Sequence, residues 1–186
     1  MTGWQLPNYV DINGRQYKIN ADYRDILDII QHLDKSQNDM TELYIAVALF
    51  YDDYESISEE DLQTAVNQMM IFINCGEEPD EKPHPKRIDW QQDRNLIIAD
   101  VNKVAACEVR SLPFCHWWTF ISWFNSIGEG QLSTVVSIRE KLRRGKKLEK
   151  WEQEYYAENK SKIDLKKQYS EEEICEINRL SALLGK

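Results

Sequence analysis

The stretch from residue 111 to residue 130 constrains the fold of this chain more than any other. It reads SLPFCHWWTFISWFNSIGEG and holds three of the six tryptophans and three of the five phenylalanines. Pro113 is typical of the first turn of a helix, and Gly128 and Gly130 are typical of its end. A helix that is apolar over most of its circumference must be covered over most of its circumference. This stretch therefore predicts a helix that is the core of the fold, a surface that binds a partner, or both.

The large side chains of this predicted helix fall on two of its sides. One side carries Phe114, Trp117, Trp118 and Ile121, and the second carries His116, Phe120, Trp123 and Ile127. We favour an internal position because most tryptophans in folded proteins are largely buried. The residues that we assign to this core or interaction helix are Phe114, His116, Trp117, Trp118, Phe120, Trp123 and Phe124.

The charge of the chain is uneven along its length. The net charge is −9 over 186 residues, which disfavours binding to nucleic acid or to anionic membranes. Residues 22–81 hold sixteen acidic side chains against two basic ones, whereas residues 139–150 hold seven basic side chains against two acidic ones. Such opposed blocks are compatible with a weak homo-oligomer or a charged partner, although two solvated faces would explain most of these charges.

The remaining pattern predicts a mainly α fold, namely a helical bundle-like domain with a short N-terminal β-hairpin. Asn13-Gly14, between two alternating segments within residues 9–19, is a strong hairpin turn signal. Helical periodicity predicts further helices over residues 22–35, 41–51, 58–76, 89–109, 133–144, 148–160 and 170–184.

We divide the chain into three segments that together form one continuous domain. Residues 1–76 hold the hairpin and three helices, and residues 89–186 hold the C-terminal helices with the tryptophan-rich helix. Between them, residues 77–88 form a proline-rich acidic connector, which we expect to be exposed because it offers almost nothing to bury. His84 lies in this connector and is expected to be solvated.

The sequence offers no convincing catalytic, metal-binding or cofactor-binding site. There is no phosphate-binding glycine loop, no nucleophile elbow and no H-E-x-x-H pair. The four cysteines, Cys75, Cys107, Cys115 and Cys175, lack the paired spacing of a zinc site, and we expect them to be reduced and mainly apolar in role. The first ten residues lack the pattern of a secretory signal, and no segment has the length of a membrane span. His116 should be a neutral structural histidine, and we expect a protein that is not an enzyme.

The order of these features resembles a known family. An NG hairpin is followed by INADYRDIL, the helix end MMIFINCG, a proline-rich acidic break, IDWQQD, the His-Trp-Trp-x-Phe block and SIREKL. This order is similar to the bacteriophage and prophage tail-morphogenesis family often called the gp-fifteen family. The resemblance covers the chain to about residue 168, and its most specific part is His116, Trp117, Trp118 and Phe120 together with Ile138-Arg139.

The resemblance implies a tail assembly chaperone. Such a chaperone would bind the tape measure protein, assist the tail-tube protein as it polymerises, act in the cytoplasm of the bacterial host, and be absent from the mature virion. The charged surface that we expect to contribute consists of Arg139, Lys141, Arg143, Arg144, Lys146 and Lys147. The alternative is a small acidic helical regulatory or nucleic-acid-associated module that uses the basic segment 139–150.

Overall fold

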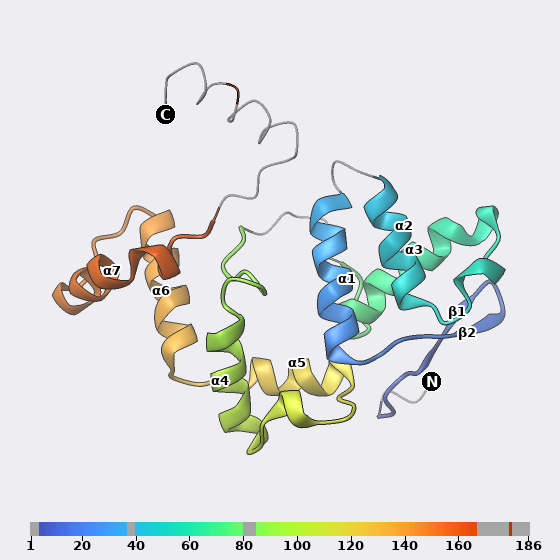
Figure 1. Ribbon diagram of the computed structural model, residues 1–186, viewed down its shortest axis with the longest axis horizontal. Helices are drawn as coiled ribbons and strands as arrows, with labels where there is room; N and C mark the ends of the chain where they lie inside the picture. Colours follow the sequence, from blue (N-terminus) through green and yellow to red (C-terminus); the bar gives the residue numbers. More distant parts are fainter. Residues whose placement is uncertain (1–3, 37–39, 80–84, 167–178, 180–186) are drawn as a thin grey trace.

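A computed structural model of the protein describes residues 4–36, 40–79, 85–166 and 179. Within these residues a two-stranded hairpin precedes seven α-helices and three short 3-10 helices (Figure 1). The elements are β1 (Tyr9–Ile12), β2 (Arg15–Lys18), α1 (Tyr23–Ser36), α2 (Met40–Phe50), η1 (Tyr54–Ser56), η2 (Glu59–Asp61), α3 (Leu62–Ile73), α4 (Arg94–Ala105), η3 (Val109–Ser111), α5 (Trp117–Asn125), α6 (Gln131–Arg143) and α7 (Lys150–Ile163). The predicted mainly α fold with an N-terminal hairpin is therefore confirmed. The helix predicted over residues 170–184, His84 and Cys175 lie outside the described residues.

The hairpin forms at the predicted turn and is anchored by its buried face. Asn13 and Gly14 adopt positive φ of 49° and 89°, as a tight two-residue turn requires. β1 and β2 pair antiparallel, with Val10 opposite Tyr17. Both of these side chains are buried in the main core, so the hairpin packs against the helices and does not stand alone in water.

The helices of the first half follow the predicted pattern. Asp22 precedes α1 and accepts a hydrogen bond from the backbone N–H of Arg24, as an N-cap residue does. Ser58 caps the turn before α3 by accepting a bond from the backbone N–H of Asp61. A 3-10 turn (η2) therefore precedes α3, and the regular α-helix begins at Leu62.

The tryptophan-rich helix begins four residues later than Pro113 predicts. Residues before it are extended and pair with the entry to α1, because Tyr23 donates its N–H to the carbonyl of Cys115 and Trp117 donates to that of Ala21. The prediction that Phe114 shares a helix face with Trp117 is therefore wrong. The Phe114 side chain lies outside α5 and is 54% exposed.

The predicted helix over residues 89–109 is also shorter, with α4 confined to Arg94–Ala105. At its start, the Asp89 carboxylate accepts bonds from the backbone N–H groups of Gln91 and Gln92 and holds a turn there. At its end, Ala106 adopts a left-handed φ of 54°, which stops the helix.

One large core holds the molecule together across the connector. Its buried residues run from Val10 in the hairpin to Leu132 at the start of α6. A second, smaller core lies between α6 and α7, which form a hairpin at the left of Figure 1. Leu96 of α4 packs against both cores and joins them. The division of the chain into three segments stays a prediction.

The start of α6 depends on Asp100 of α4. This carboxylate is 3% exposed, accepts a bond from the backbone N–H of Leu132 at 3.1 Å and pairs with Lys103 at 2.6 Å. Gly130 passes so close that an added Cβ would lie 2.6 Å from Asp100 Oδ2. α6 therefore begins where a residue without a side chain lets an aspartate reach the helix N-terminus.

We predict that Gly130→Ala lowers the free energy of unfolding by about 1–3 kcal/mol, because the new methyl group displaces the Asp100 carboxylate. Gly128→Ala is the matched control, since nothing lies within 4 Å of a Cβ at that position. We expect the control to change stability by less than about 0.5 kcal/mol. Urea unfolding of the three proteins would test this, and equal stability of the two variants would contradict it.

Candidate functional site

His116 joins the N-terminal segment to the start of α5. Its Nδ1 accepts a bond from the backbone N–H of Trp118 at 3.1 Å, which makes His116 the N-cap of the helix. Its Nε2 lies 3.0 Å from the carbonyl oxygen of Pro7 and donates to it. Since one ring nitrogen accepts and the other donates, the imidazole is neutral. Burial lowers the pKa of His116, and the bond to Pro7 opposes this only in part. The prediction of a neutral histidine agrees with this geometry.

The two tryptophans that follow cap the C-terminal end of α3. The indole N–H of Trp117 donates to the carbonyl of Ile73 at 2.9 Å, and that of Trp118 donates to the carbonyl of Phe72 at 2.9 Å. The last carbonyls of a helix lack the regular partner four residues on, so other donors satisfy them. The carbonyl of Phe72 also accepts a bond from the backbone N–H of Cys75. The three residues His116, Trp117 and Trp118, here called the His-Trp-Trp clamp, thus tie α5 to α3 and to the N-terminal segment.

The other aromatic residues of the predicted set lie around this clamp. Phe120 is fully buried and stacks on Tyr23 with ring centroids 4.5 Å apart. The ring of Phe124 packs against that of Trp90, with the ring centroids 5.1 Å apart. Trp117 is 2% exposed, and Trp123 is half-buried against the main core. The helix therefore acts mainly inside the fold, and Phe114 is the member of the set that faces solvent.

Trp118 also reaches the surface, where it forms one wall of an apolar groove. The groove has a volume of about 340 Å³ and runs between the N-terminal segment, β1 and α3. Its lining includes Pro7, Tyr9, Val10, Ile71, Phe72 and Trp118. Trp4, next in the chain to the lining residue Gln5, is 98% exposed, and Leu6 is 48% exposed. Among the predicted residues, Trp118 is therefore both a core contact and part of a candidate binding surface.

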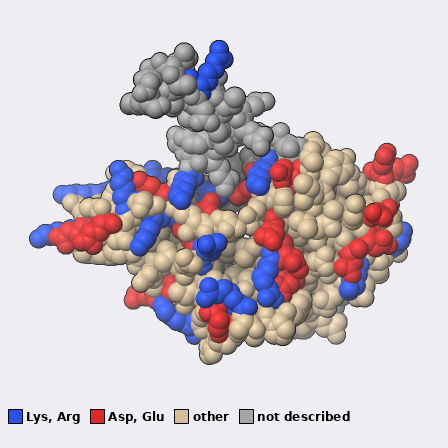
Figure 2. Space-filling model, in the orientation of Figure 1, with Lys and Arg blue, Asp and Glu red and all other residues tan. Residues whose placement is uncertain are grey.

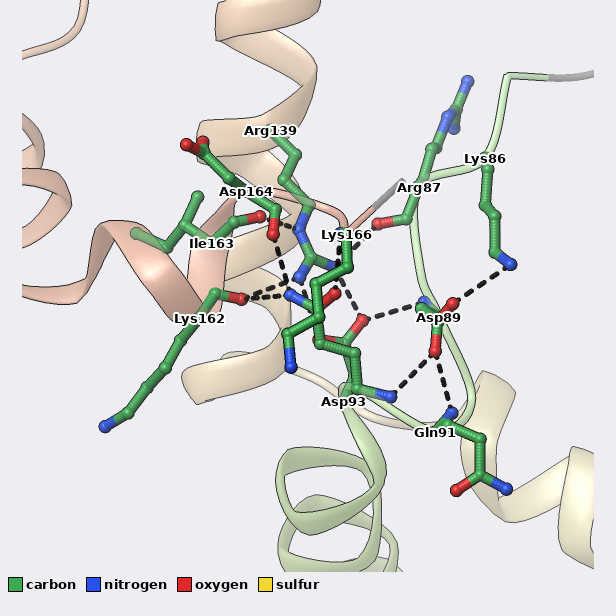
Figure 3. Close-up of polar contacts among 11 residues, drawn as sticks. Lys86, Arg87, Asp89, Gln91, Asp93, Arg139, Lys162, Ile163, Asp164 and Lys166 are labelled. Atoms are coloured by element: carbon green, nitrogen blue, oxygen red, sulfur yellow. Dashed lines mark hydrogen bonds and ion pairs between the residues drawn. The ribbon is translucent and has the colours of Figure 1, made fainter. Parts of the chain in front are cut away.

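Arg139 is buried and does not belong to a charged surface, which corrects the sequence prediction. It is 8% exposed and forms a bidentate pair with Asp93, with Nη1 and Nη2 at 2.6 and 2.9 Å from the two carboxylate oxygens (Figure 3). Its remaining N–H groups donate to three carbonyl oxygens, those of Arg87, Lys162 and Ile163. All five guanidinium donors are thus used. A charge that leaves water needs this complete set of partners, which the local sequence does not reveal.

The Arg139 cluster fixes the α6–α7 hairpin to the rest of the fold. The carbonyls of Lys162 and Ile163 end α7, that of Arg87 belongs to the end of the connector, and Asp93 precedes α4. Gln92 reinforces the same place, because its amide nitrogen donates to the carbonyls of Lys162 and Asp164. Three segments that are far apart in the sequence therefore meet at one side chain.

Most other members of the predicted charged surface are paired within the chain. Lys141 contacts the Glu152 carboxylate at 2.7 Å. Arg143 and Arg144 share Glu140, and their hydrogen bonds lower the pKa of Glu140 to about 2. Lys146 and Lys147 are exposed and form no ion pair with any described residue. With Lys150, three of the seven basic residues remain for an outside partner, which weakens the alternative of a nucleic-acid module.

The described residues contain no cluster of three or more histidine, cysteine or acidic side chains that could hold a metal ion. Burial, with a contribution from Asp22, raises the pKa of the Cys115 thiol to about 11, so it stays protonated and is a poor nucleophile. None of the described helices combines the length and apolar character needed to cross a membrane. The predicted lack of catalysis and of cofactors stays a prediction.

The fold, the clamp and the groove together describe a small α-helical protein with an apolar groove on its surface. A family model described as Bacteriophage Gp15 protein matches residues 4–165, and the chain belongs to this family. Comparison with curated proteins and with solved structures gives no match. The predicted family is therefore confirmed, and the matched range includes all residues of the Arg139 cluster.

The sequence analysis did not predict the partners of two buried aspartates, Asp22 and Asp93. Asp22 accepts bonds from the backbone N–H of Cys115 and from Arg24, and Asp93 pairs with Arg139. Asp22 and Cys115 are 93 residues apart, and Asp93 and Arg139 are 46 residues apart. Helical and strand periodicity cannot predict contacts over such separations. The groove residues Gln68 and Ile71 were missed as well, since on α3 they look like ordinary positions of an amphipathic helix.

We predict that Arg139→Met lowers the free energy of unfolding by about 3–5 kcal/mol, because it leaves the buried Asp93 carboxylate without its cation. The double variant Asp93→Leu with Arg139→Met should cost clearly less than the sum of the two single changes. The control is Arg144→Met at an exposed ion pair, with an expected change below about 1 kcal/mol. Chemical denaturation measures all four variants, and additive costs would count against the buried pair.

We predict that His116 makes stability depend on pH below neutrality. Its folded pKa is lower than the unfolded value near 6.5, so the unfolded chain binds a proton first as the pH falls. The stabilisation is therefore complete above about pH 6.5 and is lost as the pH falls from there through the folded pKa. Relative to His116→Asn, which retains a capping side chain, the wild type should lose at most ~1.4 kcal/mol more per pH unit. Unfolding curves with the same pH slope in both proteins would refute this.

Proposed function

We propose that this protein is a non-catalytic tail assembly chaperone, which binds the tape measure protein and assists the tail-tube protein as it polymerises. Membership of the bacteriophage Gp15 family supports a role in phage biology. The proposed place of action is the cytoplasm of the bacterial host, and the protein is released before the virion is complete.

The observation that carries the proposal is the apolar groove beside Trp118. A tape measure protein is a long helical chain that exposes apolar surface before the tube encloses it. An amphipathic helix binds by placing its apolar side chains in a groove of this kind. The groove is lined mainly by aromatic and aliphatic side chains, with Gln5, Asp11 and Gln68 as its polar members. Further apolar groups, those of Trp4, Leu6 and Tyr9, remain exposed beside or within it. The open groove, with a volume of about 340 Å³, takes only a few anchor side chains, which suits contacts that the tail-tube protein must later displace.

We predict that Ile71→Lys weakens binding to the tape measure protein of the same phage at least tenfold, about 1.4 kcal/mol, because the ammonium group enters the apolar groove. Val104→Lys is the matched control, since Val104 is 37% exposed on α4 and does not line the groove. The control should bind within about twofold of the wild type.

The measurement is co-purification of the chaperone with fragments that tile the tape measure protein, followed by titration of the fragment that is retained. Circular dichroism of each variant excludes loss of the fold as the cause. The proposal fails if no fragment binds the wild type, and the groove assignment fails if Ile71→Lys binds as well as Val104→Lys.

A further inference from the structure

The α6–α7 turn at one end of the molecule carries exposed apolar groups, together with cations that form no ion pair with the described residues. Lys146, Lys147 and Lys150 are exposed and pair with no described carboxylate. Beside them the Trp151 side chain is 56% exposed and that of Leu142 is 38% exposed. We call these five residues the basic tip, and the turn that holds them lies at the left end of Figure 1.

Trp151 lies at the edge of the side of α7 that packs inward, one position before the buried Glu152. The second core takes Leu148 and Ile163, with Tyr155 and Tyr156 against it, and the buried Glu152 binds Lys141. Trp151 therefore has no position in this small core. A tryptophan that leaves more than half of its surface in water is unusual and often marks a contact with another protein.

The opposite end of the molecule presents the complementary surface. Tyr54 is 46% exposed between the exposed carboxylates of Asp53 and Glu55, and Glu59 and Glu60 follow in the chain. No described cation pairs with these four carboxylates, although neighbouring Asp52 pairs with Lys18 at 2.6 Å. In Figure 2 acidic side chains predominate at the right-hand end, whereas basic and acidic side chains lie close together at the left-hand end.

Exposed apolar residues also occur on α2, the helix that precedes this acidic segment in the chain. Tyr44 is 55% exposed and Leu49 is 39% exposed, although α2 is apolar on nearly all sides. A helix of that composition is normally covered on all sides. We call Asp53, Tyr54, Glu55, Glu59 and Glu60 the acidic face.

The basic tip and the acidic face cannot meet within one molecule, because they lie at opposite ends of its longest axis (Figure 1). We propose that the basic tip of one copy docks on the acidic face of a second copy. Three ammonium groups would meet four carboxylates, and Trp151 would pack against the exposed Tyr54. This contact joins two different surfaces, so each added copy leaves one of each free and an open array grows.

The array is expected to be weak and sensitive to salt. Exposed charge pairs contribute little individually and are screened as the ionic strength rises. Trp151 and Tyr54 then supply the specific part of the contact, as aromatic residues commonly do at protein interfaces. Arg143 and Arg144, which the sequence also placed in this surface, already share Glu140 and are not needed.

The test uses the protein alone, so its outcome is independent of any binding to a tape measure protein. Variant T carries Lys147→Gln, Lys150→Gln and Trp151→Gln in the basic tip. Variant F carries Tyr54→Gln, Glu55→Gln and Glu59→Gln in the acidic face. The matched control carries Trp4→Gln, Lys160→Gln and Lys162→Gln, which removes the same residue types at exposed positions elsewhere.

Sedimentation velocity across concentration and salt gives the masses. We expect the wild type and the control to form concentration-dependent oligomers that shrink in salt, and variants T and F to remain at the 22.0 kDa of one chain. An equimolar mixture of T and F should stop at dimers. The intact acidic face of T binds the intact basic tip of F, and the two surfaces left over in this dimer are the substituted ones, so no further copy can bind. Monomeric wild type at high concentration and low salt would overturn the proposal. Oligomers in variant F alone, or growth beyond dimers in the mixture, would also overturn it. Circular dichroism spectra confirm that each variant is folded.

Discussion

The polar groups at the ends of helices must be satisfied, and this protein satisfies them with side chains from distant segments. The two indole N–H groups of the His-Trp-Trp clamp close the C-terminal end of α3, while the imidazole of His116 caps α5 and binds the carbonyl of Pro7. Each bond is modest in isolation, but a buried carbonyl that loses its donor costs more than the bond contributes. The clamp therefore sets the relative position of α3, α5 and the N-terminal segment, and with it the walls of the groove.

The same constraint explains why a charge lies inside a small domain. The side chain of Arg139, a residue of α6, lies at the end of α7 and donates to its last carbonyls, while Asp93 neutralises the guanidinium. None of the buried side-chain nitrogen or oxygen atoms in the described chain lacks a hydrogen-bond partner. The two halves of the protein are therefore joined by an apolar core near α5 and by a polar cluster near α6.

Local patterns predicted the elements of the fold, and non-local pairings decided their details. Asn13-Gly14 predicted the hairpin because turn geometry depends on adjacent residues. Pro113 predicted too early a start for α5, since the pairing of residues 115–117 with the entry to α1 has no signal in the nearby sequence. Arg139 was predicted to be exposed because it belongs to a run of basic residues, whereas its partner Asp93 is 46 residues away. Trp118 was identified, but the groove beside it also needs Pro7 and α3, which only tertiary packing brings together.

The residues of the Arg139 cluster contribute in two ways. Some hold the guanidinium with a backbone carbonyl, and others contribute their side chain. Arg87, Lys162 and Ile163 contribute carbonyl oxygens to the guanidinium, and a carbonyl is present whatever side chain the residue carries. Substitution at position 87 or 162 can therefore leave the cluster intact, whereas Asp93 and Arg139 have to change together or not at all. Exposed side chains at the end of the connector and at the end of α7 can therefore change in sequence while the backbone contacts to Arg139 are kept.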